Sequence, residues 1–408
     1  MTFRFLKSTF LFLLILAAAC GNISSQKNGT ATKKTSEEKY TQNLSLGAER
    51  TEAYLPLLKG KKVGVVGNQT SIITTEKSPV HLVDSLLKLG VDIRKVFAPE
   101  HGFRGTADAG EVVKDGKDAK TGLPIISLYG DNKKPTPEQL KDLDILIFDI
   151  QDVGARFYTY ISTLHYLMEA AAENNIPVIV FDRPNPNGHY IDGPILEPEH
   201  QSFVGMHQVP VVHGMTIGEY ARMINGQKWL KNGLKADLQV IEMENYNHDL
   251  KYELPVNPSP NLPNATAINL YPSLCFFEGS NVNAGRGTDK QFQIFGSPFL
   301  PKEKYDYSYV PEPNEGAKYP KHQGKTCYGK DLSKSPFLSS INLKWLIDAY
   351  HNTSQKEEFF NSFFTKLAGT TKLQEQIESG MTAEEIRMTW KSGLEEFAKV
   401  REKYLFYE

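Results

Sequence analysis

Cysteine is scarce in this 408-residue chain, which contains only three. Three cysteines exclude a disulfide-stapled scaffold and a four-thiolate zinc site. A charge imbalance is also missing, because 46 basic and 48 acidic residues leave a net charge of −2 at pH 7. A nucleic-acid-binding protein is usually clearly basic, so nucleic acid is not an expected partner. The 40% of apolar residues and the length predict a globular protein of two domains.

Several familiar catalytic motifs are missing as well. The chain has no G-x-S-x-G elbow, H-E-x-x-H helix, Walker A loop or G-x-G-x-x-G fingerprint. A serine nucleophile of the α/β-hydrolase type, a zincin site and the usual nucleotide cradles are therefore not expected. The histidines show no recognisable metal-ligand spacing, and we expect neither a metal nor another cofactor.

The N-terminus has the order of a bacterial export signal. Arg4 and Lys7 precede an apolar stretch over residues 10–19, which is shorter than a transmembrane helix normally requires. Small residues then lead into Cys20, as in a lipobox, so we expect residues 1–19 to be a cleaved signal peptide and Cys20 to be lipidated. The polar segment 20–45 is expected to be a flexible tether. The protein would then be exported and lipid-anchored at the periplasmic face of a bacterial membrane. The alternative is an ordinary signal peptide with a chance cysteine.

Short apolar runs alternate with helical patterns through the first half of the chain. Strands are expected at residues 62–67, 94–98, 124–129, 144–150, 177–182 and 237–242, and helices at 81–89 and 161–174. This alternation predicts a Rossmann-like, doubly wound, mostly parallel α/β sheet over residues 46–245. Capping boxes at Thr216 and Thr382 predict two further helix starts. Residues 246–408 are expected to form a smaller α+β domain, with a long loop over 298–325.

Four of the expected strands end in polar clusters, at residues 68–70, 99–105, 149–158 and 182–188. Ligands of open parallel sheets bind beyond the carboxyl ends of the strands, so these clusters could share one cleft. Any one of them could instead be a turn or a helix cap, and Asp149 could brace a loop. The predicted site residues here are Asn68, Gln69, Glu100, His101, Arg104, Asp149, Gln151, Asp152, Arg156, Tyr158, Arg183 and Asn185.

A further polar cluster lies in the second half, over residues 278–289. It contributes Glu278, Asn281 and Arg286, and its glycines allow backbone amides to approach a ligand. The alternative is a surface loop. Amides, carboxylates and guanidinium groups suit a sugar, because they hydrogen-bond hydroxyls in fixed directions. Glycosidic cleavage needs an acid for the leaving oxygen, and we expect Glu100 in that role with His101 beside it.

The chain resembles the NamZ-type exo-β-N-acetylmuramidases, glycoside hydrolase family 171, formerly a family of unknown function. The stretches that carry the resemblance are GVVGNQTS (64–71), VFAPEHGFRG (96–105), DILIFDIQDVGARFYTYISTL (144–164), FDRPNPNG (181–188), HGMTIGEYA (213–221), NPSPNLP (257–263) and YPSLCFFEGSNVNAGRGTDKQF (271–292). The resemblance implies a cleft between a Rossmann-like domain and a smaller C-terminal domain. It also implies release of N-acetylmuramic acid from the non-reducing ends of peptidoglycan fragments, with Glu100 as the key glutamate. The second catalytic group and the oligomeric state stay open.

Two other functions remain compatible with the same residues: a metal-assisted hydrolase using His101 and aspartates, and a lipid-anchored sugar-binding protein without turnover. A site that selects muramic acid should offer an arginine to its lactyl carboxylate. We expect Arg286 or Arg104 in this role. Arg286 has no acidic neighbour before Asp289 in its loop, whereas Arg156 and Arg183 follow strand ends rich in aspartate and could form salt bridges there.

Overall fold

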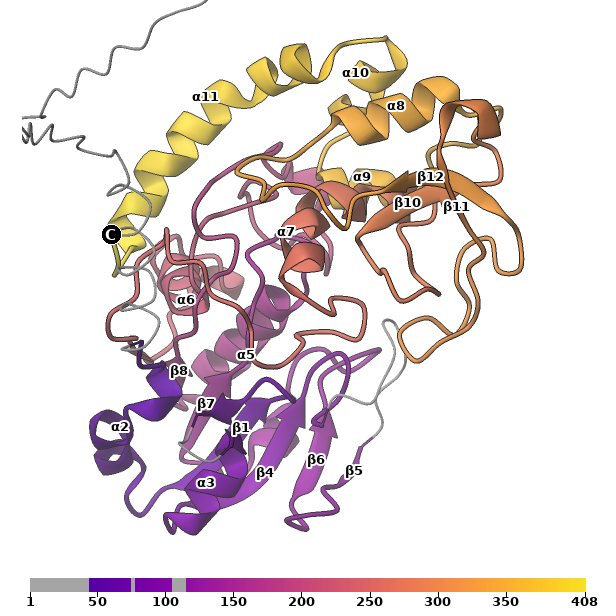
Figure 1. Cartoon of the computed structure of the whole chain (residues 1–408). Coiled ribbons are helices and arrows are strands. Elements are labelled where there is room, and N and C mark those ends of the chain that lie inside the picture. Colours follow the sequence, from indigo (N-terminus) through magenta and orange to yellow (C-terminus); the bar gives the residue numbers. More distant parts are fainter. Residues whose placement is uncertain (1–43, 75–77, 105–114) are drawn as a thin grey trace, which may run out of the picture.

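A seven-stranded sheet forms one end of the molecule (Figure 1). The computed structural model describes residues 44–74, 78–104 and 115–408. The strands are β1 (Lys62–Gly67), β4 (Asp92–Ala98), β5 (Gly116–Lys117), β6 (Pro124–Ser127), β7 (Ile145–Asp149), β8 (Val178–Phe181) and β9 (Leu238–Ile241). Their order is β5-β6-β4-β1-β7-β8-β9, and every neighbouring pair is parallel except β5 with β6.

Without the short β5, the strand order follows the Rossmann pattern, with the topological switch between β1 and β7. Ligands of such sheets bind beyond the carboxyl ends of the strands near this point, so the loops after the central strands β4, β1 and β7 should deliver the site. The expected doubly wound, mostly parallel sheet is confirmed. The strands begin and end within two residues of their expected positions, and the central strands β1, β7 and β8 are buried almost throughout.

Successive side chains of a strand point to opposite faces, and helices cover both faces of this sheet. Val66 and Phe148 pack in a large core with α5 (Tyr160–Asn174) and α6 (Ile217–Gly226). Val65 and Ile147 pack in a second core with α2 (Thr51–Leu58) and α3 (Leu82–Lys88). Continuous apolar strands are therefore explained by burial on both sides.

Both expected capping boxes are present. At the start of α6, the Thr216 hydroxyl accepts a hydrogen bond from the backbone amide of Glu219. The Glu219 carboxylate in turn accepts one from the backbone amide of Thr216. Thr382 and Glu385 make the same exchange at the start of α11 (Ala383–Arg401). These reciprocal bonds satisfy backbone donors that a helix start otherwise leaves unpaired.

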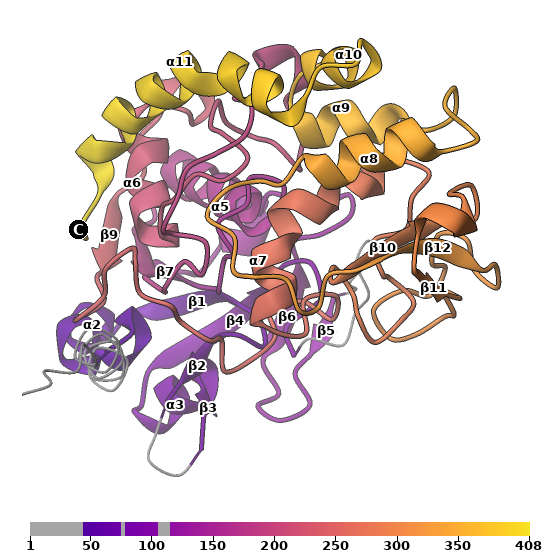
Figure 2. The same cartoon turned by 45° about the horizontal axis from the view of Figure 1, so that its top comes forward.

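The second domain is smaller and mixed. It contains α7 (Ala265–Leu274), the 3-10 turn η4 (Cys275–Gly279), and an antiparallel sheet of β10 (Ile294–Ser297), β12 (Cys327–Asp331) and β11 (Tyr307–Tyr309). The helices α8 (Lys344–Asn352), α9 (Ser362–Ala368), α10 (Lys372–Glu378) and α11 complete it (Figure 2). The expected loop over 298–325 was wrong in part, because it contains β11.

Cys275 and Cys327 are buried and free. In the described part of the chain, no helix is long and apolar enough to cross a membrane.

Candidate active site

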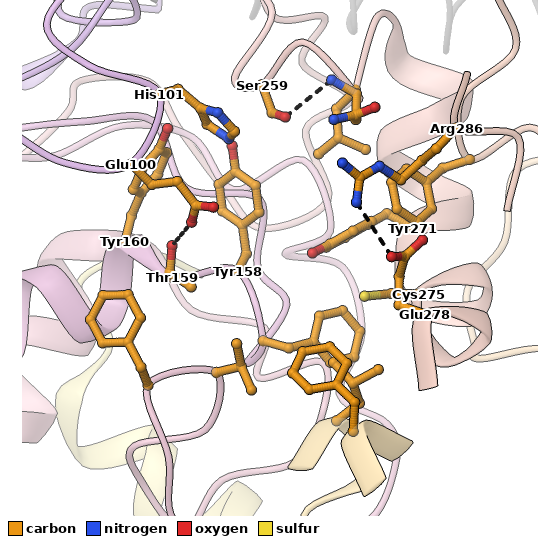
Figure 3. Close-up of a pocket in the computed structure, with 18 of the residues that line it drawn as sticks. Glu100, His101, Tyr158, Thr159, Tyr160, Ser259, Tyr271, Cys275, Glu278 and Arg286 are labelled. Carbon is orange, nitrogen blue, oxygen red and sulfur yellow. Dashed lines mark hydrogen bonds and ion pairs between the residues drawn. The ribbon is translucent and has the colours of Figure 1, made fainter. Parts of the chain in front are cut away.

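A pocket of about 290 Å³ lies between the carboxyl end of the sheet and the second domain (Figure 3). One wall carries Glu100 and His101 after β4, and another carries residues 157–160 before and at the start of α5. The second domain closes it with side chains of α7, η4 and the loop that bears Arg286. We call this cavity the Glu100 pocket. Its position at the switch point is where the strand order places a ligand.

Glu100 is held by two hydroxyl groups from different elements. The Tyr129 hydroxyl, from the loop after β6, donates to Oε1 at 3.0 Å, and the Thr159 hydroxyl, just before α5, donates to Oε2 at 2.7 Å. Each carboxyl oxygen thus has one fixed donor, which orients the carboxyl group in the wall. The turn itself places His101 at φ +71° with its side chain buried. A non-glycine residue in this region is uncommon, and such strain gathers at functional sites.

Glu278 and Arg286 face Glu100 from the other side of the pocket (Figure 3). The guanidinium Nη1 of Arg286 lies 3.4 Å from Glu278 Oε2, and its Nη2 donates to the Gly316 carbonyl at 3.1 Å. The expectation that Arg286 lacks an acidic neighbour was wrong, because the fold brings Glu278 to it from eight residues earlier. The pair presents a carboxylate and a guanidinium on one wall.

Two glycines give the Arg286 loop its shape. Gly285 and Gly287 have φ +81° and +82°. A Cβ atom at Gly285 would lie 2.4 Å from the Lys290 carbonyl oxygen, and one at Gly287 would lie 2.6 Å from Pro320 Cβ. Only glycine tolerates both the conformation and the close approach. The glycine-rich pattern therefore serves to turn the chain around Arg286.

Aromatic rings form much of the remaining lining. Tyr158 and Tyr160 meet edge to face at 4.8 Å, and Tyr158 meets Tyr271 at 5.9 Å. Both Tyr158 and Tyr160 donate to the Pro258 carbonyl, at 2.8 and 3.2 Å. Burial raises the pKa of Tyr158, Tyr160 and Tyr271 above the usual range, so the three phenols stay neutral. The lining is thus apolar with a few fixed polar groups, as in most small-molecule sites.

Arg104 lies away from the pocket lining, against our expectation. Its guanidinium binds Asp118 at 2.7 and 3.1 Å and Asp84 at 3.3 Å. This pairing holds the pKa of Asp118 down at about 2, although burial acts in the opposite direction. The physical reason is local: the chain turns after Gly102, and Arg104 meets acidic residues near α3 and β6 instead of the cleft.

Arg183 and Arg156 are also engaged elsewhere. Arg183 binds both oxygens of the fully buried Asp149, at 2.6 and 2.9 Å, which is one of the salt bridges considered from the sequence. Asp149 therefore braces the strand ends instead of lining the pocket. Arg156 is fully buried and donates to four backbone carbonyls, those of Pro194, Val209, Leu367 and Ala368. It joins the loops after β8 to the end of α9.

The other predicted site residues outside the lining hold loops in place. Asn68 donates to the Tyr160 hydroxyl at 2.8 Å, immediately behind the pocket. Gln151 donates to the Pro184 carbonyl, Asn185 to the Met215 carbonyl, and Asn281 to the Gln355 carbonyl. Asp152 accepts from the Gly154 amide and lies 3.9 Å from His213. Gln69 binds the backbone of residues 257–258 and lines a neighbouring groove.

The structure brings together five of the predicted residues in the pocket lining, which are Glu100, His101, Tyr158, Glu278 and Arg286. Sequence reasoning missed Tyr129, Thr159, Ser259 and Asn261. Tyr129 is the last residue of the third expected strand, 124–129, and the polar residues at that strand end were overlooked. Thr159 lies inside the long motif over 144–164. Ser259 and Asn261 lie in the proline-rich crossing, which carries no catalytic pattern of its own.

One group of described residues has three possible metal ligands close together: Glu197, Glu199 and His200. None of the three lines the Glu100 pocket. Glu197 is already engaged by Lys372 at 2.6 Å and by Thr370 at 2.9 Å. This cluster therefore gives no support to a metal acting in the pocket.

Comparisons with known proteins agree with this architecture. The family described as "Exo-beta-N-acetylmuramidase NamZ, N-terminal" matches residues 63–266, and "Exo-beta-N-acetylmuramidase NamZ, C-terminal" matches residues 269–407. The chain is 40% identical to the peptidoglycan beta-N-acetylmuramidase NamZ of Bacillus subtilis (strain 168), over 99% of both chains.

Two crystal structures of DUF1343 family proteins from Bacteroides fragilis NCTC 9343 share the fold. One has a TM-score of 0.83 and 45% sequence identity, and the other has a TM-score of 0.75 and 28% sequence identity. Each match covers 90% of this chain and 99% of the chain in the crystal structure. The matches of both family segments and the full-length likeness lead to one conclusion: the chain belongs to the NamZ exo-β-N-acetylmuramidase family.

Proposed function

We propose that this protein is a glycoside hydrolase that releases N-acetylmuramic acid from the non-reducing ends of peptidoglycan glycan fragments. The observation that carries this proposal is the match of both family segments on a chain whose Rossmann switch point holds Glu100 in a pocket. Membership of the NamZ family indicates the reaction class, and the Glu100 pocket is a place where one terminal sugar could bind.

Glu100 is the general acid/base in this proposal. Its carboxyl group is fixed by Tyr129 and Thr159 at the pocket wall, so its proton can be delivered to a leaving oxygen in a constant direction. Cleavage breaks the bond between the anomeric carbon and the glycosidic oxygen, and that oxygen takes the proton. Water supplies the hydroxyl group of the released sugar, and its proton restores Glu100.

Arg286 is the group that would recognise the lactyl carboxylate of muramic acid. It lies on the wall opposite Glu100, and Glu278 and the Gly316 carbonyl hold its guanidinium in place. A guanidinium stays charged and matches a carboxylate with two parallel donors. N-acetylglucosamine lacks the lactyl group, so this arginine would distinguish the two sugars.

We also propose that the protein is exported and anchored through a lipid on Cys20 at the periplasmic face of a bacterial membrane. The support is the order of basic, apolar and small residues before Cys20. These residues lie outside the described part of the chain. An anchored enzyme would meet peptidoglycan fragments at the cell envelope.

The direct test is incubation of the purified protein with chromogenic glycosides of N-acetylmuramic acid and N-acetylglucosamine. We expect turnover of the muramic glycoside, a much lower rate with the other sugar, and no loss of rate with a chelator. Binding without turnover would support a sugar-binding protein instead. A rate that a chelator abolishes and added metal restores would support a metal-assisted hydrolase.

A further inference from the structure

A second, more open hollow of about 750 Å³ adjoins the Glu100 pocket. Asp289, Glu312 and Glu315 line it, together with amide side chains such as those of Gln69 and Asn314. We call it the acidic groove. Among its lining residues, all within the described part of the chain, there is no lysine or arginine. The groove is therefore acidic, whereas the neighbouring pocket offers the Arg286 guanidinium beside the Glu278 carboxylate.

The two hollows share a wall. Ser259 lines both, and Gly316 lines the groove. The Gly316 carbonyl accepts from Arg286 Nη2 at 3.1 Å and from Asn261 Nδ2 at 2.6 Å, and both of these side chains line the pocket. A saccharide that leaves the pocket on this side would enter the groove directly.

The groove offers acceptors for hydroxyl and amide hydrogens. The amide groups of Gln69 and Asn314 donate to backbone carbonyls, while Gln69 Oε1 and Asn314 Oδ1 accept no hydrogen bond from the described residues. An unsatisfied acceptor beside a hollow favours a ligand rich in donors. The carboxylates of Glu312 and Glu315 are exposed in the groove and can accept hydrogen bonds from such a ligand. An N-acetylhexosamine carries several hydroxyl groups, an amide hydrogen and no charge.

We propose that the acidic groove binds the neutral N-acetylhexosamine on the leaving-group side of the scissile bond, and that its acidic side chains disfavour a further anionic sugar there. This inference rests on the proposed function. Peptidoglycan chains alternate neutral and anionic sugars, so the sugar after the leaving hexosamine carries a lactyl carboxylate. Like charges brought together at a binding surface suppress the wrong partner. The groove would thus favour the disaccharide over longer chains.

The test compares peptide-free disaccharide and tetrasaccharide, each with muramic acid at the non-reducing end, using the full chain. The variant is Glu312→Lys/Glu315→Lys, which reverses two exposed charges of the groove. The matched control is Glu396→Lys/Glu402→Lys, which makes the same charge change at exposed positions of the C-terminal helical segment. The readout is the ratio of kcat/KM for the tetrasaccharide to kcat/KM for the disaccharide.

We expect a ratio below one for the wild type and the control, and a rise of about tenfold in the groove variant, which corresponds to about 1.4 kcal/mol. Melting temperatures check folding, and Glu312→Gln/Glu315→Gln, which should raise the ratio less, replaces the lysine variant if that variant unfolds. An equal ratio in wild type, variant and control overturns the groove proposal while the proposed function stands. Absence of cleavage of either saccharide by the wild type overturns the proposed function, and the groove proposal with it.

Discussion

At the scale of single residues, the Glu100 pocket separates residues that can meet a ligand from residues that only resemble site residues in the sequence. Glu100, Glu278 and Arg286 reach the pocket, whereas Arg183 and Asp149 neutralise each other beneath it. Sequence position alone identified Glu100, Asp149 and Arg183 alike as polar residues at strand ends. The direction of each side chain depends on contacts far away in the chain, and for this reason the sequence could not separate them.

Arg286 gives the first prediction at this scale. Replacing Arg286 with Ala should lower kcat/KM for the muramic glycoside by the equivalent of roughly 2–5 kcal/mol, because the lactyl carboxylate then lacks its partner. The rate with the N-acetylglucosamine glycoside should change far less. Arg104→Ala is the matched control, since Arg104 pairs with Asp84 and Asp118 outside the pocket. An unchanged preference in Arg286→Ala would mean that the enzyme selects the lactyl group by shape or by backbone donors.

Asp152 gives a second prediction, on pH dependence. Burial raises the pKa of Asp152 to about 7, well above the value of an unfolded chain. A carboxyl group with a raised folded pKa costs stability as the pH rises from about 4 through 7, because the unfolded state ionises first. Asn resembles the protonated acid, so Asp152→Asn should remove this cost. The gain in unfolding free energy over the wild type should be small at pH 4 and largest at pH 8.

Chemical denaturation at several pH values measures this difference. The neighbouring His213 has its pKa lowered to about 3 by burial, which adds stability as the pH rises toward 6.5. Wild-type stability therefore combines two opposing trends, and only the difference between variant and wild type isolates Asp152. A constant difference across this pH range would show that Asp152 is ionised throughout.

At the scale of elements, the parallel strands were predictable, whereas the antiparallel strands of the second domain were not. Continuous apolar runs flanked by helical patterns identify buried parallel strands, and the runs of β1, β7 and β8 are fully or nearly fully buried. The strand β11 (Tyr307–Tyr309) is short, partly exposed and set among prolines, so no periodicity reveals it. Its position depends on pairing with β12, which is a contact between distant residues.

Arg156 tests how the elements are joined. Its guanidinium donates to carbonyls of the loops after β8 and of the end of α9, so it links the two domains. Arg156→Lys keeps the charge but cannot satisfy four acceptors. Each buried acceptor left unpaired costs about 1–3 kcal/mol, so we expect a clear fall in melting temperature. Arg94→Lys, which alters an exposed pair with Asp92, is the control and should melt like the wild type. Equal melting of both variants would refute the linking role.

At the scale of the whole molecule, the two domains share one core and the chain end returns to the first domain. Side chains of α5 and α6 belong to the same buried cluster as those of α7, α9 and α11. The Tyr407 hydroxyl donates to Asp182 at 2.7 Å, at the carboxyl end of β8. The resemblance to a known family predicted a second domain beside the cleft. The contacts between the domains could not be predicted from the local sequence pattern, because they join residues that lie far apart in the chain.

Membrane attachment is a prediction for the whole molecule. Cys20→Ser removes the thiol that would carry the lipid, so the protein should move from the membrane fraction to the soluble fraction. Fractionation followed by immunoblotting measures this shift, with Cys327→Ser as a control that keeps the signal sequence intact. Full retention of Cys20→Ser in the membrane fraction would contradict the lipid anchor.

The most direct test of the whole account is the rate of Glu100→Gln on the chromogenic muramic glycoside, measured beside its melting temperature. Gln keeps the shape of the side chain but cannot donate and regain the proton. General acid–base assistance is typically worth about 10²–10⁴-fold, so we predict a loss of at least about a hundredfold with an unchanged fold. A rate within a few-fold of the wild type, at matched melting temperature, would contradict the central role of Glu100.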